Sequence, residues 1–102
     1  MPMMTPARLA MCEELRRVYL GLSVRSMMDA PGMMILLVNT ESPAWRGEMK
    51  VGDILMEIEG KPVNLINELY DAIADAHGKS LAFKINRKGA EVLCYVTFPH
   101  AA

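Results

Sequence analysis

The feature that most constrains this fold is a succession of short apolar segments, each closed by glycine, proline or other turn-forming residues. Their alternating or wholly apolar character predicts β-strands at 19–27, 33–40, 54–58, 81–85 and 92–98, with a short extended piece at 62–63. One segment, 65–77, has helical spacing instead and ends at His77-Gly78; its apolar stripe comprises Leu69, Ala72, Ile73 and Ala76. The pattern therefore predicts a mostly β chain with one substantial helix.

Two further signals define the connections between these elements. Ser42 can cap a helix and Pro43 suits its first position, which predicts a short helix ahead of Gly47. The segment 87–90 is typical of a hairpin turn, with Gly89 at the position of positive φ. The resulting order predicts an α+β fold: a small, partly open, mostly antiparallel β-barrel of five to six strands, capped by one short and one long helix.

The chain length of 102 residues fits one domain. We interpret residues 1–7, with two prolines and no periodicity, as a disordered lead. Residues 8–18 favour a helix with Met11, Leu15 and Val18 on one face, which either packs on the domain or links it to a neighbour. The folded domain is expected over 19–98, followed by a tail at 99–102.

Composition and spacing exclude several classes of partner and cofactor. The formal net charge is −1, so there is no basic excess to neutralise a phosphate backbone, and we expect no nucleic-acid partner. The longest apolar run, 33–38, is far too short to cross a bilayer, and no signal peptide is visible. Cys12 and Cys94 permit one disulfide, but a core of this size does not require it, so two free thiols are expected. No spacing suggests a metal site, and no cofactor is expected.

Nothing in the sequence predicts catalysis by this chain. It has only two histidines, His77 and His100, and no motif of a serine nucleophile or a phosphate-binding loop. We interpret His77 as a favourable charge at a helix C-terminus and Asp53 as a turn residue that starts a strand. Any enzymatic activity is expected to belong to a longer parent chain, possibly a serine endopeptidase.

Six short motifs, in this order and spacing, resemble a PDZ domain of the kind attached to HtrA/Deg serine proteases. They span about residues 17–98 and are Tyr19-Leu20-Gly21-Leu22, Ser42-Pro43-Ala44, Gly47 with Lys50-Val51-Gly52-Asp53-Ile54-Leu55, Gly60-Lys61-Pro62-Val63, Glu68-Leu69 with Ala72-Ile73, and Arg87-Lys88-Gly89. The resemblance implies the HtrA-type strand order, in which the peptide-binding strand opens the domain. Glu48 departs from the pattern where small or apolar residues are common. His77-Gly78 departs where Pro-Gly is usual, which implies a helix end shifted by about one residue.

The resemblance implies a peptide groove, and the residues themselves agree with it. Successive amides around a glycine form an anion-binding nest suited to a terminal carboxylate. We assign this nest to the amides of Leu20, Gly21 and Leu22, in a carboxylate-binding loop that begins at Tyr19. The peptide would continue as an added antiparallel strand along Ser23, Val24 and Arg25. The opposite wall would come from the long helix, through Ile66, Tyr70 and Ile73. An apolar C-terminal residue is the expected ligand.

The function implied is peptide binding by β-strand addition, as the substrate-binding and regulatory domain of an HtrA-like serine protease. The parent would then lie in the periplasm, mitochondrion or chloroplast, and its protease domain is a possible partner. The alternative is a PDZ-like adaptor or assembly module of a non-protease protein associated with membranes or secretion. In the assembly version, a neighbouring subunit or the chain's own tail at 96–102 fills the groove. Trp45 is either an anchor for a partner domain or a lid on the short helix.

Overall fold

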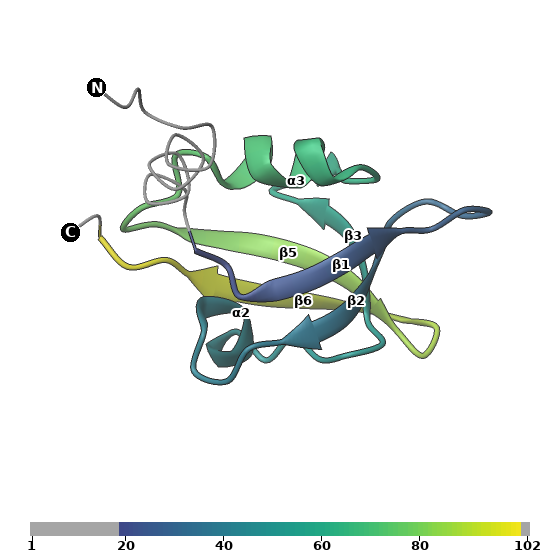
Figure 1. The fold of residues 1–102 in the computed structure, drawn as a ribbon, viewed down its shortest axis with the longest axis horizontal. Helices are drawn as coiled ribbons and strands as arrows, with labels where there is room; N and C mark the ends of the chain where they lie inside the picture. Colours follow the sequence, from purple (N-terminus) through teal and green to yellow (C-terminus); the bar gives the residue numbers. More distant parts are fainter. Residues whose placement is uncertain (1–18, 101–102) are drawn as a thin grey trace, which may run out of the picture.

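The computed structural model describes residues 19–100, so the expected lead at 1–7 and helix at 8–18 lie outside the described residues. Figure 1 shows the strands crossing the middle of the molecule, with one helix on either side. The elements, in chain order, are β1 (Leu22–Ser26), β2 (Met33–Val38), α2 (Pro43–Arg46), β3 (Ile54–Ile58), β4 (Lys61–Pro62), α3 (Ile66–Ile73), β5 (Ser80–Arg87) and β6 (Ala90–Thr97).

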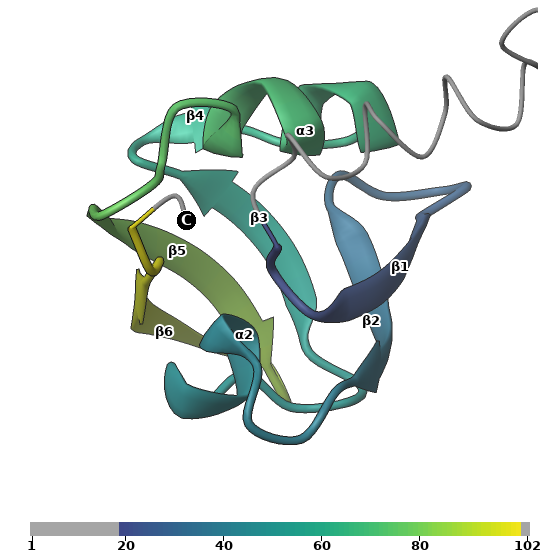
Figure 2. The same ribbon diagram turned by 60° about the vertical axis from the view of Figure 1, so that its left-hand side comes forward.

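The described strands form one six-stranded antiparallel sheet with the order β1-β2-β3-β5-β6, and β4 pairs with β3 beside this path. The sheet curls without closing, and α3 and α2 cover opposite sides of the curl (Figure 2). The predicted α+β architecture, a partly open barrel with one short and one longer helix, is confirmed. The first strand of the described chain, β1, lies at the edge of the sheet next to the opening.

The core forms because alternate residues of each strand point into the curl. On β5 and β6 this alternation buries Phe83, Ile85 and Val96 completely, and on β3 it buries Leu55. The rings of Phe83 and Phe98 contact each other with centroids 6.4 Å apart. The α3 helix adds Leu69 and Ile73 from one face, both almost fully buried, as its apolar stripe predicts.

The long helix is shorter than the sequence predicts, because it covers 66–73 instead of 65–77. Beyond Ile73 the amides of Ala74 and Ala76 donate to carbonyls only three residues back, which tightens the chain into a turn. The Gly78 amide then donates to the Pro99 carbonyl, tying this turn to the end of the chain. His77 therefore follows the helix by several residues, and the interpretation of His77 as a charge in its last turn is wrong.

The β5–β6 hairpin has the tight turn that the sequence predicts, whereas β1 starts later than predicted. Lys88 and Gly89 both have positive φ, at 53° and 84°, which is the two-residue turn typical of a tight hairpin. The prediction of positive φ at Gly89 is confirmed. The first strand covers 22–26 and does not begin at Tyr19, because the Leu20 carbonyl accepts a hydrogen bond from the Ala44 amide of α2.

Candidate functional site

A cavity of about 490 Å³ lies between β1 and α3. This volume is within the range of pockets that hold a ligand side chain and part of its backbone. The lining contains every site residue that the sequence predicts except Arg25, which is exposed on β1 and outside the lining. The complete lining is Tyr19, Leu20, Gly21, Leu22, Ser23, Val24, Asn39, Ile66, Leu69, Tyr70 and Ile73.

The β1 side of the cavity is a sheet edge with exposed main-chain groups. In the described sheet β1 pairs only with β2. The Asn39 amide donates to the Gly21 carbonyl at 2.8 Å, so the next pair, Leu22 opposite Val38, is a non-hydrogen-bonded pair of the antiparallel ladder. The N–H and C=O of Leu22 therefore point away from β2. By the same alternation Val24 also presents its main-chain groups at this edge, because the Met27 amide donates to Gly32 on the other side of the bulge.

In the loop before β1, two successive carbonyls accept hydrogen bonds from neighbouring elements. The Leu20 carbonyl accepts from the Ala44 amide at 3.0 Å, and the Gly21 carbonyl accepts from Asn39. The described peptide bonds are all trans, and in a trans peptide the N–H points opposite to the preceding carbonyl. The Gly21 and Leu22 amides therefore point away from α2 and β2, on the side of the cavity. Two adjacent donors of this kind can hold an anion such as a carboxylate.

The glycine at position 21 is required by both its conformation and its surroundings. Its φ is +89°, in a region that residues other than glycine rarely adopt. A Cβ placed there would collide with the Cβ and Oγ of Ser42. Ser42 itself is fixed as the cap of α2, where its Oγ accepts from the Trp45 amide at 3.2 Å. The loop can therefore lie against α2 only because residue 21 has no side chain.

The α3 side of the cavity has two exposed walls and a buried floor. Ile66 and Tyr70 are 45% and 44% exposed, whereas Leu69 and Ile73 are 3% exposed and contribute to the floor. The helix begins here because Glu68 reaches back and its Oε1 accepts from the amides of Asn64 and Leu65, both at 2.9 Å. The lining contains Ile66, Tyr70 and Ile73, the three helix residues that the sequence analysis assigned to the groove wall.

Asn64 links the start of α3 to the far end of β1. Its carbonyl accepts from the Ser26 hydroxyl at 2.8 Å, and its Oδ1 accepts from the Gly32 amide at 2.7 Å. These hydrogen bonds join the helix to the β1–β2 connection across more than thirty residues of sequence. They fix the separation between the helix and the strand edge at this end of the cavity.

Two lining residues were missed by the sequence analysis. Asn39 donates from its side-chain Nδ2 to the Tyr19 hydroxyl at 2.9 Å, and both residues line the cavity. The only local feature of Asn39 in the sequence is its position after the apolar run of β2, and an asparagine there is typical of a turn. Leu69 was assigned to the core alone, but a side chain in the floor of a groove is buried by the same packing.

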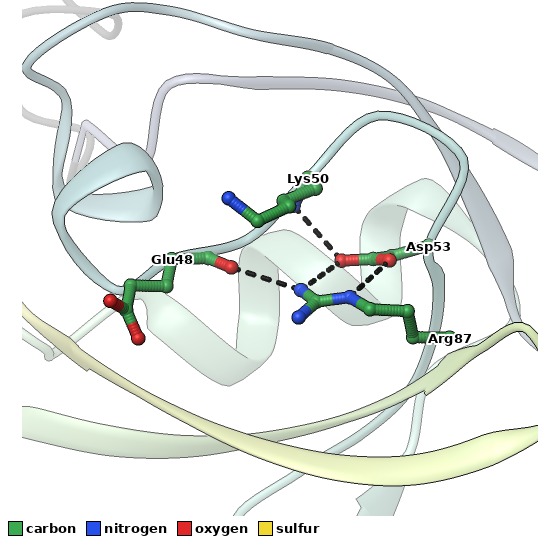
Figure 3. Close-up of polar contacts among 4 residues, drawn as sticks. All are labelled: Glu48, Lys50, Asp53 and Arg87. Atoms are coloured by element: carbon green, nitrogen blue, oxygen red, sulfur yellow. Dashed lines mark hydrogen bonds and ion pairs between the residues drawn. The ribbon is translucent and has the colours of Figure 1, made fainter.

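A second polar cluster lies away from the cavity, at the start of β3 (Figure 3). Asp53 is 3% exposed; its Oδ1 accepts from Arg87 Nε at 2.9 Å and its Oδ2 accepts from another Arg87 nitrogen at 2.7 Å. Oδ2 also accepts from the Lys50 amide, and Arg87 donates in addition to the Glu48 carbonyl. Burial raises the pKa of Asp53, but the hydrogen bond from Arg87, the Lys50 amide and the two positive charges outweigh it, so its pKa is lowered. A paired, ionised carboxylate of this kind supports the structural interpretation of Asp53.

Three other residues that the sequence analysis singled out, Glu48, Trp45 and Cys94, lie outside the lining of this cavity. Glu48, the departure from the family pattern, turns its side chain to solvent with φ of +66°, and the next residue, Met49, fills the buried position instead. Trp45 on α2 is 48% exposed. Cys94 is a buried free thiol, and burial raises its pKa; Cys12 lies outside the described residues.

Within residues 19–100, no cluster of three or more His, Cys, Asp or Glu side chains has the arrangement of a metal site. In the same part of the chain, no helix has the length and apolar character needed to span a membrane.

An exposed sheet edge that faces a helix across a cavity defines a module able to take an extended segment as an additional strand. The family model described as "PDZ domain" matches residues 34–87, more than half of the chain. This chain therefore belongs to the PDZ domain family. The match begins after β1, so the loop at 19–22 lies outside the matched residues.

Solved structures with a similar fold include PDZ domains of HtrA proteins. One is the HtrA3 PDZ domain bound to a phage-derived ligand (FGRWV), with a TM-score of 0.73 and 21% identity, covering 80% of this chain and 85% of that one. Another is the HtrA-type protease AlgW with a decapeptide, with a TM-score of 0.74 and 19% identity, covering 81% of this chain. The chain spans 29% of the AlgW chain.

Proposed function

We propose that this chain is a peptide-binding module that takes the C-terminal or exposed apolar segment of another protein as a strand added to β1. The observation that supports this most directly is the cavity between β1 and α3, which has free main-chain groups along one wall and apolar side chains along the other. Main-chain hydrogen bonds to the strand edge would supply affinity, and the cavity would select the side chain. The HtrA3 neighbour, whose fold is similar, is bound to a short peptide-like ligand.

The proposed ligand ends in an apolar residue with a free carboxylate. The Gly21 and Leu22 amides would receive the carboxylate, and the last side chain would enter between Leu22, Tyr70 and the buried Ile73. Full burial of one aliphatic side chain is worth about 1.5–3 kcal/mol, so a charged last residue would lose this contribution and add a desolvation cost. The outward main-chain groups of Leu22 and Val24 would pair with the preceding residues of the ligand, with Ser23 between them in the groove strand, and Arg25 would face solvent.

The setting we propose is the substrate-binding and regulatory domain of an HtrA-like serine protease. The fold similarity to HtrA PDZ domains supports it, as does the position of the groove strand at the start of the described chain. The alternative is an adaptor or assembly module of a non-protease protein. The sequence upstream in the parent decides between them, because a trypsin-like catalytic triad there is required by the first setting and absent from the second.

The test is a titration of the chain with peptides from a random C-terminal library, each made as the free acid and as the amide. We expect tight binders to end in an apolar residue and to lose affinity on amidation. Truncation of Tyr70, a half-exposed wall residue, to alanine should weaken binding by about 1–3 kcal/mol. Ile73→Ala should do the same, and Ile66→Ala should act further along the peptide.

Leu93→Ala is the matched control, because Leu93 is an exposed apolar side chain on β6 and outside the cavity lining. Its affinity for the same peptides should equal that of the wild type. Unchanged affinity in both the Tyr70 and Ile73 variants would refute the groove assignment. Equal binding of acids and amides would refute the carboxylate site while leaving the strand addition to be judged by the wall variants.

A further inference from the structure

Tyr19 and Asn39 form a polar contact at the carboxylate end of the cavity. The Nδ2 of Asn39 donates to the Tyr19 hydroxyl at 2.9 Å, and both residues line the cavity. The backbone amide of Asn39 also donates to the Gly21 carbonyl at 2.8 Å. Asn39 is therefore attached to the loop through its main chain and to Tyr19 through its side chain. These two bonds connect the tyrosine hydroxyl to the loop through Asn39.

The phenol ring of Tyr19 folds back over the loop. A Cβ built on Gly21 would lie 3.5 Å from Cζ of Tyr19, the ring carbon that bears the hydroxyl. The side chain is 57% exposed, so its position is not explained by burial in the core. The ring carbon that bears the hydroxyl is thus a near neighbour of Gly21, whose amide lies in the same loop.

The direction of the Asn39 hydrogen bond determines what the hydroxyl can still do. A tyrosine hydroxyl has one hydrogen to donate and lone pairs to accept with. Because Tyr19 accepts from Asn39, its own hydrogen is not used in that bond. An ionised carboxylate only accepts hydrogen bonds and has about four lone-pair sites, so two backbone amides leave room for another donor. A hydrogen bond to a charged acceptor is about twice as strong as one between neutral groups.

We propose that the Tyr19 hydroxyl, oriented by Asn39, is an additional donor to the ligand's terminal carboxylate and makes the groove select free C-termini over amidated ends and internal segments. Tyr19 is then a binding residue and Asn39 a positioning residue. This inference rests on the proposed peptide-binding function and narrows its ligand class. Main-chain pairing with β1 does not distinguish a chain end from an internal segment, so this selectivity has to come from the loop and from Tyr19.

The experiment measures affinities for one apolar-ended library peptide, as acid and as amide, in the wild type, Tyr19→Phe, Asn39→Ala and the double variant. Tyr19→Phe keeps the ring and removes only the donor. We expect it to weaken the acid about three- to tenfold and to change the amide by less than about twofold. Asn39→Ala should lower the acid-to-amide ratio in the same direction, and the double variant should lose no more than Tyr19→Phe alone. Tyr95→Phe, which removes a hydroxyl outside the groove lining, should match the wild type.

Each outcome bears on a different claim. Tyr19→Phe binding the acid as tightly as the wild type, or weakening acid and amide equally, overturns the role of the hydroxyl while the proposed function stands. Additive losses in the double variant overturn the positioning role of Asn39. Equal binding of acid and amide by the wild type overturns both this inference and the carboxylate site. A wild type that binds neither form overturns the proposed function itself. Denaturation midpoints of all variants, expected to equal that of the wild type, exclude a loss of folded protein.

Discussion

Replacing Arg87 by methionine tests the cluster that holds the start of β3 to the end of β5. Asp53 is 3% exposed and receives two hydrogen bonds from Arg87, at 2.9 and 2.7 Å. Methionine keeps much of the length of the side chain and removes its charge. The carboxylate would then be buried with only the Lys50 amide as a hydrogen-bond donor, and the Glu48 carbonyl would lose its contact. Leaving one partner of a buried ion pair unpaired costs about 3–5 kcal/mol.

We expect Arg87→Met to fall at the lower end of this range, about 3 kcal/mol, because the Lys50 amide remains and the Arg87 side chain is itself 30% exposed. This is a large part of the roughly 5–15 kcal/mol that stabilises a domain. The measurement is the free energy of unfolding from urea denaturation. Lys84→Met is the matched control, because Lys84 pairs with Glu57 and Glu91 at the surface and such pairs contribute little.

The loss should also depend on pH. The pKa of Asp53 is lowered in the folded protein from its ordinary value of 3.8, so its ionised form stabilises the fold above that pH. This contribution disappears as the pH falls below 3.8, through the lowered pKa of the folded state. In Arg87→Met the carboxyl group can be protonated with less loss, so the difference between the two proteins should shrink towards low pH. A penalty equal to that of Lys84→Met, or one that does not change between neutral pH and pH 3, would refute this reasoning.

Two further predictions concern the loop and the thiol. Gly21→Ala should destabilise the fold more than Gly52→Ala. Both glycines have positive φ, 89° and 93°, so both variants incur a backbone strain of about 1–2 kcal/mol, but of the two only a Cβ at position 21 would collide with other atoms, those of Ser42. Equal losses of unfolding free energy in urea denaturation would contradict the collision. In a Cys12→Ser background, Cys94 should react with a thiol reagent at neutral pH only as fast as the protein opens. Burial keeps the reagent away from the thiol and raises the pKa of Cys94. A labelling rate that does not increase with denaturant would contradict this.

Local signals predicted the elements well where contacts distant in sequence agreed with them. The limits of β3, 54–58, match the prediction, because its apolar run ends at a turn formed by Glu59 and Gly60, both with positive φ. The end of α3 does not match, because the stop signal at His77-Gly78 is local while the real end depends on Gly78 bonding to Pro99. A pattern of residues contains no information about which distant carbonyl an amide will reach.

Most of the residues that line the cavity were assigned to the site from the sequence. Helical spacing placed Ile66, Tyr70 and Ile73 on the flank that lines the cavity, because three or four residues bring a helix back to the same face. On β1 the sequence analysis assigned the consecutive residues Ser23, Val24 and Arg25 to the groove, and the cavity lining contains the first two but not Arg25. Asn39 was missed because its role depends on Tyr19, twenty residues earlier, and on the register of β1 against β2.

The two ends of the groove are anchored independently of any ligand. At one end Gly21 is held by Asn39 and lies against Ser42, and at the other Asn64 accepts from Ser26 and Gly32. Between them, the outward N–H and C=O groups of Leu22 and Val24 are left to the added strand. The peptide proposed above would therefore complete the sheet edge without moving the helix. Because such a preformed groove avoids part of the ordering cost of binding, its selectivity should come from the carboxylate-binding loop and the cavity rather than from closure of α3.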